Sequence, residues 1–209
     1  MQPELIETIL VAADGSIPLL QRHLGRLQAS AQALGYRCDA QAVEADLLAA
    51  AGTLATPGPH RLRLLLDVAG HRTIQAAPLP PLPPQQQIML GPDMIDPDQP
   101  LLRYKTTHRP WYQRAVEWLP KHPQVFDLVY MNDRGELCEG SRSNLYLKLD
   151  GRWYTPPLSC GCLPGVQRAE LLDRGQVHER VLPLARLREA EGIRLSNALR
   201  GWFDVVLRD

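Results

Sequence analysis

The order of hydrophobic and polar positions predicts a first module that mixes strands and helices. Residues 4–12 read as a strand, and the Asp14–Gly15 pair that follows favours a turn. Apolar residues recur every three or four positions over 18–34, which predicts a helix with one buried face. An alanine-rich stretch after it predicts a second helix, and the runs from 60–68 to 86–90 predict three short strands.

Proline-rich segments separate this module from the rest of the chain. The run PLPPLPP at 78–84 removes backbone donors and favours an extended conformation, so we read it as a rigid connection, with a ligand for a proline-binding partner as the alternative. Prolines and acids interrupt every periodic pattern over 92–100. The sequence therefore predicts an N-terminal domain over 1–91 and a C-terminal domain over 92–209.

The second module is also expected to mix strands and helices. Residues 101–105 predict a short strand, and Pro110 suits the first turn of a helix, so Lys105 is expected just before a helix. The remaining predicted elements are strands over 126–131 and 145–149, a hairpin at Asp150–Gly151 leading into 152–156, a helix over 163–172, and two strands within 192–207.

Composition narrows the function classes. The 209 residues carry 23 basic and 23 acidic side chains, so no net charge attracts nucleic acid or an acidic membrane. No apolar run approaches the roughly 20 residues that span a bilayer, and the start of the chain lacks the layout of a signal peptide. Four cysteines without regular spacing are typical of a reducing compartment. We expect a cytoplasmic protein that binds neither nucleic acid nor membranes.

Four blocks of sequence carry candidate chemistry. They are LLRYKTTHRPWYQRA, NDRGELCEGSRSNLYL, TPPLSCGCLPGVQRAELL and RLSNALRGW. Together with the N-terminal IETILVAADGSIPLLQRHLGRLQASAQALGY, they make the chain resemble the class IV aminotransferase family over nearly its whole length. The resemblance implies an α+β, fold-type IV enzyme that uses pyridoxal 5'-phosphate (PLP), with a small α/β sandwich N-terminal domain and a larger C-terminal domain with a β-barrel-like core.

Such a cofactor needs an amine, a partner for its ring nitrogen and a cradle for its phosphate. The resemblance assigns Lys105 to the Schiff base with the cofactor and to the later proton transfer, and Glu139 to the ring nitrogen. Arg26 is expected at the phosphate, because a guanidinium matches phosphate oxygens and keeps its charge. The resemblance also gives the phosphate a helix start and a second stretch, which comprise Gly165, Val166, Gln167, Asn197, Ala198 and Leu199.

Within the family, KTTHR, TPPLSCG and the RGW ending are most similar to aminodeoxychorismate lyases, in particular to the module fused to component I of para-aminobenzoate synthase. That likeness implies conversion of 4-amino-4-deoxychorismate into 4-aminobenzoate and pyruvate, a step in folate synthesis. Candidate substrate contacts are Thr107, His108, Arg109 and Arg200. Two alternatives remain: a class IV aminotransferase for branched-chain or D-amino acids, and a non-catalytic partner subunit of the chorismate-aminating enzyme.

Several further expectations concern assembly and other side chains. Standalone relatives begin with an additional strand and turn before the position of Leu5, so this start resembles the fused module. We expect a homodimer, because enzymes of this class build their site at a dimer interface. Cys160 and Cys162 lack a second ligand pair, and no metal is expected. Ser141 and Ser143 lack a His and Asp partner, so they are expected to brace the cofactor strand.

Overall fold

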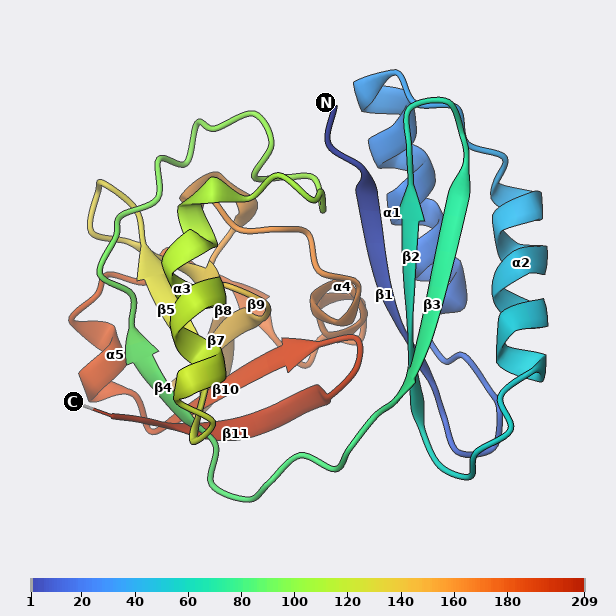
Figure 1. The fold of residues 1–209 in the computed structure, drawn as a ribbon. Coiled ribbons are helices and arrows are strands. Elements are labelled where there is room, and N and C mark those ends of the chain that lie inside the picture. Colours follow the sequence, from blue (N-terminus) through green and yellow to red (C-terminus); the bar gives the residue numbers. More distant parts are fainter. Residues whose placement is uncertain (1, 209) are drawn as a thin grey trace. The chain divides into compact units, whose positions relative to one another are not determined.

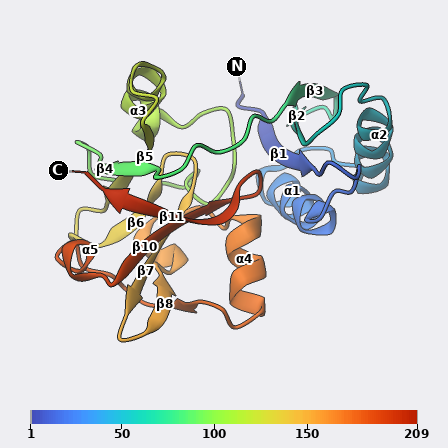
Figure 2. The same cartoon turned by 90° about the horizontal axis from the view of Figure 1, so that it is seen from below.

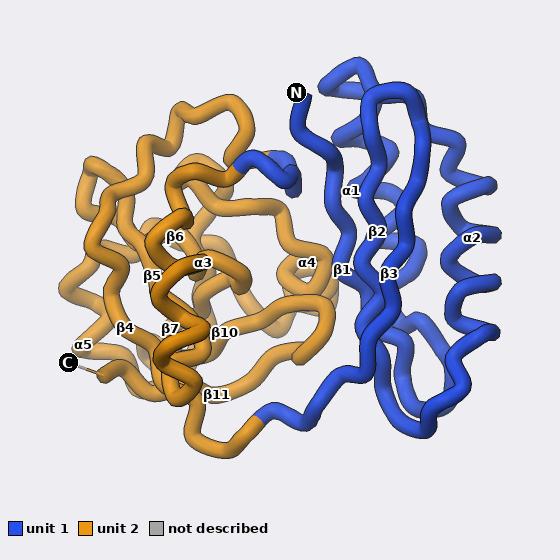
Figure 3. The backbone as a smooth tube through the Cα atoms, in the orientation of Figure 1, with its two compact units in different colours: residues 1–82, 104–108 blue, residues 83–103, 109–209 orange. Residues whose placement is uncertain are grey.

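The computed structural model describes residues 2–208, and the chain folds into two compact units (Figure 3). Unit 1 contains the chain up to Leu82 together with Tyr104–His108, and unit 2 contains Pro83–Arg103 and the chain from Arg109 onward. The domain boundary predicted from the sequence lies after residue 91, within unit 2. Residues 87–90 belong to unit 2 because they pair there with two strands of its sheet.

Unit 1 is a three-stranded antiparallel sheet with two helices (Figure 1). Its strands are β1 (Leu5–Val11), β2 (His60–Leu66) and β3 (Arg72–Pro78), and its helices are α1 (Leu20–Leu34) and α2 (Ala40–Gly52). Helix α1 packs on β1, and α2 packs on β2 and β3. The small α/β sandwich and the helix expected over 18–34 are thereby confirmed.

Strand β1 alternates buried and half-buried side chains because successive residues of a strand point to opposite faces. Its buried side chains include Leu5, Ile9 and Val11, which join the core with Leu24 and Leu27 of α1. Glu7 occupies the same buried face of the strand. A carboxylate therefore lies in the apolar layer of unit 1, and it needs charged or hydrogen-bonding partners there.

Unit 2 is built around a closed six-stranded barrel (Figure 2). The sheet runs β10-β11-β4-β5-β6-β7, and β7 pairs with β10 to close it, as the β-barrel-like core was expected to do. Strand β4 is parallel to both of its neighbours, and the other barrel pairings are antiparallel. The barrel strands are β4 (Gln87–Leu90), β5 (Val125–Met131), β6 (Leu137–Gly140), β7 (Asn144–Leu149), β10 (Gly192–Asn197) and β11 (Gly201–Leu207).

Short elements decorate this barrel. Strand β8 (Arg152–Thr155) extends it as a hairpin from β7, and β9 (His178–Glu179) adds to β8. The helices of unit 2 are α3 (Gln113–Trp118), α4 (Val166–Asp173) and α5 (Arg186–Glu189). Short 3-10 turns lie at Pro110–Tyr112, just before α3, at Leu119–Lys121 and at Leu158–Cys160. No helix within residues 2–208 has the length and apolar character to cross a membrane.

Two elements differ from the sequence prediction. The expected strand over 101–105 is wrong: the chain turns there, with the Leu102 N–H donating to Gln99 O at 3.1 Å, and Leu102 is buried in the core of unit 2. Strand β6 was not predicted. It has four residues, all buried, and its pairing with β5 and β7 rather than a local pattern gives it its conformation.

Candidate functional site

Lys105 lies in an irregular segment of unit 1 that is tied to β1. The Ile6 N–H donates to Lys105 O at 2.8 Å, and the Thr107 N–H donates to Glu4 O at 2.9 Å. The Thr107 hydroxyl accepts the Glu4 N–H at 2.9 Å, so both backbone and side chain of Thr107 hold the segment to the sheet. The side chain of Lys105 is half-buried. The candidate amine is therefore fixed through its backbone by the edge of a rigid sheet.

Arg26 lies on α1 and is bound by the buried carboxylate of β1. Its Nε donates to Glu7 Oε1 at 2.9 Å, and its Nη2 donates to Glu7 Oε2 at 2.6 Å. His23, one turn earlier on α1, places Nδ1 2.6 Å from Glu7 Oε2. Burial alone would raise the pKa of Glu7, but the charges of Arg26 and His23 and their hydrogen bonds lower it from 4.5 to about 2. Glu7 therefore stays ionised and fixes the plane of the Arg26 guanidinium.

Glu139 lies at the end of β6, where three side chains of unit 2 hold its carboxylate. Tyr112 donates its hydroxyl to Oε1 at 2.8 Å, Arg109 Nη2 lies 3.2 Å from Oε1, and the Asn144 amide donates to Oε2 at 3.2 Å. Burial and the Glu139 charge raise the pKa of Tyr112 well above its usual value, so Tyr112 keeps its proton. Glu139 is 2% exposed, which makes it a buried, oriented carboxylate.

Arg109 has a structural role that sequence reasoning did not assign. Besides Glu139, its guanidinium donates to Ser141 O at 3.0 Å and lies over the Tyr112 ring, 4.5 Å from the centroid. It is therefore a partner of Glu139 in unit 2, and a contact between Arg109 and substrate stays a prediction. His108, also expected near the substrate, is exposed and belongs to unit 1.

The start of helix α4 is packed against the residues that hold Glu139. Gly165 precedes the helix, and a side-chain carbon built on it would lie 2.0 Å from Asn144 Oδ1. The Asn144 amide also donates to Leu163 O at 3.0 Å, so one side chain links Glu139 to the loop before the helix. The first N–H groups of a helix lack partners within it and attract anions. Gly165, Val166 and Gln167 thus combine a close approach of the backbone with an anion-binding helix end.

The second expected phosphate stretch lies between β10 and β11. Asn197 Oδ1 accepts the N–H groups of Leu199 and Arg200 at 3.1 and 3.0 Å, which closes the turn through Ala198. Because Asn144 pairs with Ser196, this turn and the turn before β7 lie at the same end of the barrel. The Asn197 amide donates to Arg142 O at 3.4 Å, which joins the two turns directly.

Asp127 is a further buried carboxylate, and it was not predicted from the sequence. It lies on β5, fully buried, and accepts from the hydroxyls of Ser141 and Ser143 at 2.5 Å each. It also accepts the backbone N–H groups of Ser141 and Arg142 at 3.0 and 3.1 Å. These bonds fix the turn between β6 and β7. Burial raises the pKa of Asp127 against the opposing hydrogen bonds from the serines.

Cys160 and Cys162 are buried, and burial raises the pKa of their thiols to about 11 and about 12. Such thiols are not nucleophilic near neutral pH. Among residues 2–208, no three His, Cys, Asp or Glu side chains are grouped so that they could hold a metal ion.

Within unit 1, neighbouring residues of β1 bind the backbone of Lys105 and the side chain of Arg26. Within unit 2, direct contacts join Glu139, Asn144 and Gly165. Glu7 was missed, although a glutamate alternating with apolar residues in a strand signals a buried charge that needs a partner. Tyr112 and Asn144 were missed because the chain turns that bring them to Glu139 have no local pattern.

Comparison with known proteins identifies relatives over the whole length. The family model described as "Amino-transferase class IV" matches residues 4–207. A Schizosaccharomyces pombe protein described as "Putative aminodeoxychorismate lyase" is 31% identical over 206 residues, covering 95% of this chain and 87% of that protein.

Two solved structures are similar in fold as well as in sequence. The structure of a "Putative amino-acid aminotransferase" from Mesorhizobium loti has a TM-score of 0.91 and 36% identity, covering 99% of this chain and 100% of the other. The 4-amino-4-deoxychorismate lyase from Pseudomonas aeruginosa has a TM-score of 0.81 and 28% identity, covering 99% of this chain and 83% of the other.

Proposed function

Because the chain belongs to the class IV aminotransferase family of PLP-dependent enzymes, we propose that it is a 4-amino-4-deoxychorismate lyase that releases 4-aminobenzoate and pyruvate. The observation that carries this choice is the similarity to the Schizosaccharomyces pombe protein over 95% of the chain. The Pseudomonas aeruginosa lyase structure supports it. Branched-chain or D-amino acid transfer and a non-catalytic role become the alternative outcomes of the test.

The residues present fit the cofactor. A ring nitrogen that carries a proton needs a carboxylate, and Glu139 is buried and oriented by three donors. A phosphate needs cationic and N–H donors, which Arg26 and the start of α4 supply. Glu7 binds Arg26 through two hydrogen bonds, which hold the guanidinium in a fixed orientation. Gly165 leaves room for the Asn144 side chain, which packs where a side-chain carbon would lie and binds Glu139.

In the proposed reaction PLP supplies an electron-withdrawing ring that stabilises negative charge on the carbon bearing the substrate amine. Lys105 would hold the cofactor through Nζ, and the same Nζ would then take the proton from that carbon. Glu139 keeps the ring nitrogen protonated, while Tyr112, Arg109 and Asn144 hold its carboxylate in place. With that proton removed, the bond between the ring carbon and the enolpyruvyl oxygen would break, the released enolpyruvate would take up a proton to become pyruvate, and formation of the aromatic ring would drive the step.

Phosphate binding is proposed for Arg26, for the α4 start at Gly165, Val166 and Gln167, and for the turn at Asn197, Ala198 and Leu199. Arg200 is proposed to bind a substrate carboxylate, with Thr107 and His108 as further contacts. A homodimer is part of this proposal, as is an association with a chorismate-aminating subunit. Sedimentation at micromolar concentration tests the dimer, and a single monomeric species would contradict it.

The function is tested in two steps. Addition of PLP to the purified protein is expected to give the visible absorbance of a lysine-bound cofactor, and Lys105→Ala is expected to abolish it. Lys121→Ala, at an exposed position after α3, is the matched control and should keep the absorbance. The protein is then given aminodeoxychorismate, and 4-aminobenzoate and pyruvate are measured in equal amounts. Transfer of an amine to 2-oxoglutarate without 4-aminobenzoate would refute the lyase.

A further inference from the structure

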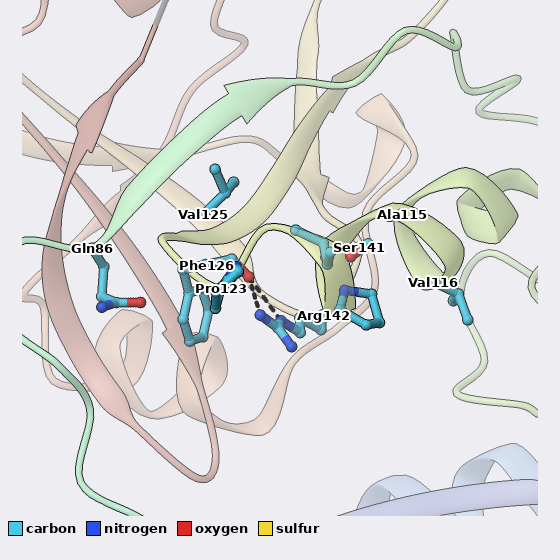
Figure 4. Close-up of a pocket in the computed structure, with 10 residues that line it drawn as sticks. Gln86, Ala115, Val116, Pro123, Val125, Phe126, Ser141 and Arg142 are labelled. Atoms are coloured by element: carbon cyan, nitrogen blue, oxygen red, sulfur yellow. Dashed lines mark hydrogen bonds between the residues drawn. The ribbon is translucent and has the colours of Figure 1, made fainter.

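A cavity of about 380 Å³ lies in unit 2 beside the turn between β6 and β7 (Figure 4). This volume falls within the roughly 300–1,000 Å³ that is typical of small-molecule sites. Three polar side chains, Gln86, Ser141 and Arg142, line it. The other lining residues are apolar: Ala115, Val116, Leu119, Pro120, Pro123, Val125 and Phe126. The cavity thus combines an apolar wall with one cation.

The cation is held rigidly. Arg142 Nε donates to Phe126 O at 2.9 Å, Nη2 donates to the same oxygen, and the guanidinium lies 4.7 Å from the centre of the Phe126 ring. Its backbone N–H donates to Asp127 at 3.1 Å, and Asp127 also fixes the adjoining serines. The turn that carries Arg142 is therefore anchored at both backbone and side chain. A preorganised cation of this kind loses little entropy when it binds an anion.

Arg142 has no ion-pair partner among the acids of the described chain. Within residues 2–208, no carboxylate lies within ion-pair distance of its guanidinium. Asp127 is the acid that interacts electrostatically with Arg142. Its two carboxylate oxygens accept the hydroxyls of Ser141 and Ser143. Burial raises the pKa of Asp127, and the serine hydrogen bonds and the charge of Arg142 oppose that shift.

A second guanidinium lies near the first. The Asn197 side chain joins the backbone of Arg142 to that of Arg200, through bonds of 3.4 and 3.0 Å. Burial and then the charge of Arg142 lower the pKa of Arg200, so the two cations repel one another. Arg200 does not line the cavity, so Arg142 is the cation that faces it.

We propose that Arg142 and the cavity beside it bind the carboxylate of a flat six-membered ring, with the ring against the apolar side chains of the cavity wall and the carboxylate on Arg142. Apolar and aromatic walls match the faces of such a ring, and a guanidinium matches its carboxylate. Arg142 is then a binding residue for that carboxylate. The identity of the ring rests on the proposed lyase function, whereas recognition of a ring carboxylate does not.

The test measures binding of 4-aminobenzoate by calorimetry to the full chain saturated with PLP. In Arg142→Gln the affinity is expected to fall about tenfold or more, because a charge-assisted hydrogen bond is lost, and Arg142→Lys should recover part of it. Arg152→Gln, an exposed arginine in the β7–β8 hairpin, is the matched control and should bind as the parent does. The uncharged 4-aminobenzamide should bind the parent and Arg142→Gln equally weakly.

Absence of 4-aminobenzoate binding to the parent overturns the inference. Equal affinity of Arg142→Gln and the parent also overturns it, as does an equal loss in Arg152→Gln. Inorganic phosphate should compete poorly; competition equal to that of 4-aminobenzoate would show a general anion site and contradict the ring carboxylate. A protein that binds 4-aminobenzoate through Arg142 but releases no pyruvate from aminodeoxychorismate would refute the lyase and leave this inference standing.

Discussion

Replacement of Glu7 by glutamine tests the buried ion cluster that holds Arg26. The carboxylate of Glu7 is 2% exposed and accepts two hydrogen bonds from Arg26. His23 Nδ1 lies 2.6 Å from one of its oxygens. Glutamine keeps the size of the side chain but removes its charge. Arg26 is then left partly buried without its counter-ion, and breaking a buried pair in this way is strongly destabilising.

The magnitude follows from the pKa of Glu7. The pKa of Glu7 is about 2 in the folded protein, below the usual 4.5. Each pKa unit corresponds to about 1.4 kcal/mol, so the fold favours the charged form of Glu7 over the neutral form by about 3 kcal/mol. Because the folded pKa is the lower one, the unfolded chain binds more protons as the pH falls. The contribution is therefore complete above about pH 4.5 and is lost as the pH falls from there toward about 2.

The assay is urea unfolding of the parent and Glu7→Gln at a series of pH values. All four tryptophans belong to unit 2, whereas the two longest helices, α1 and α2, belong to unit 1. Far-ultraviolet circular dichroism therefore follows unit 1, and tryptophan fluorescence follows unit 2. Glu44→Gln is the control, because Glu44 makes only an exposed hydrogen bond to Gln21, and it should change stability by less than about 0.5 kcal/mol.

We expect the dichroism to show a gap of about 3 kcal/mol between the parent and Glu7→Gln at neutral pH, closing as the pH approaches about 2. A gap that stays constant with pH would mean that packing rather than charge accounts for the loss. No gap at neutral pH would refute the stabilising role of the cluster. Either result would also remove the reason to regard Glu7 as the residue that orients Arg26.

Two further predictions concern unit 2 and its control in unit 1. Tyr112→Phe removes the 2.8 Å hydrogen bond to Glu139. Urea unfolding should therefore show a free energy of unfolding lower by about 1–3 kcal/mol, and a PLP titration should show weaker binding. Unchanged values of both would show that the bond contributes nothing. Gly165→Ala places a carbon 2.0 Å from Asn144 Oδ1, so it should lower both the stability of the protein and its affinity for PLP. Gly25→Ala, in open space on α1, is the control and should stabilise the protein by about 0.5–1 kcal/mol. The same response from both variants would contradict the argument.

Local patterns determined much of the fold. The period of 3.6 residues gave α1, and alternation gave β1 and β2, because these elements bury one face and their sequences repeat at the spacing of that face. The blocks around Lys105, Glu139 and Gly165 resembled those of one family, and the family model matches residues 4–207. Chemistry that depends on residue types in a fixed order is therefore readable without a structure.

Other features were decided only by tertiary structure. Residues 101–105 contain strand-forming residues, yet they turn because burial of Leu102 and bonding of Lys105 to β1 outweigh local preference. Closure of the barrel depends on the pairing of β7 with β10, whose residues are far apart in sequence. Asp127 and Arg142 meet because β5 pairs with β6, which brings the turn after β6 beside Asp127. Each of these contacts joins residues that are distant in the sequence, so a local pattern around one residue carries no information about its partner.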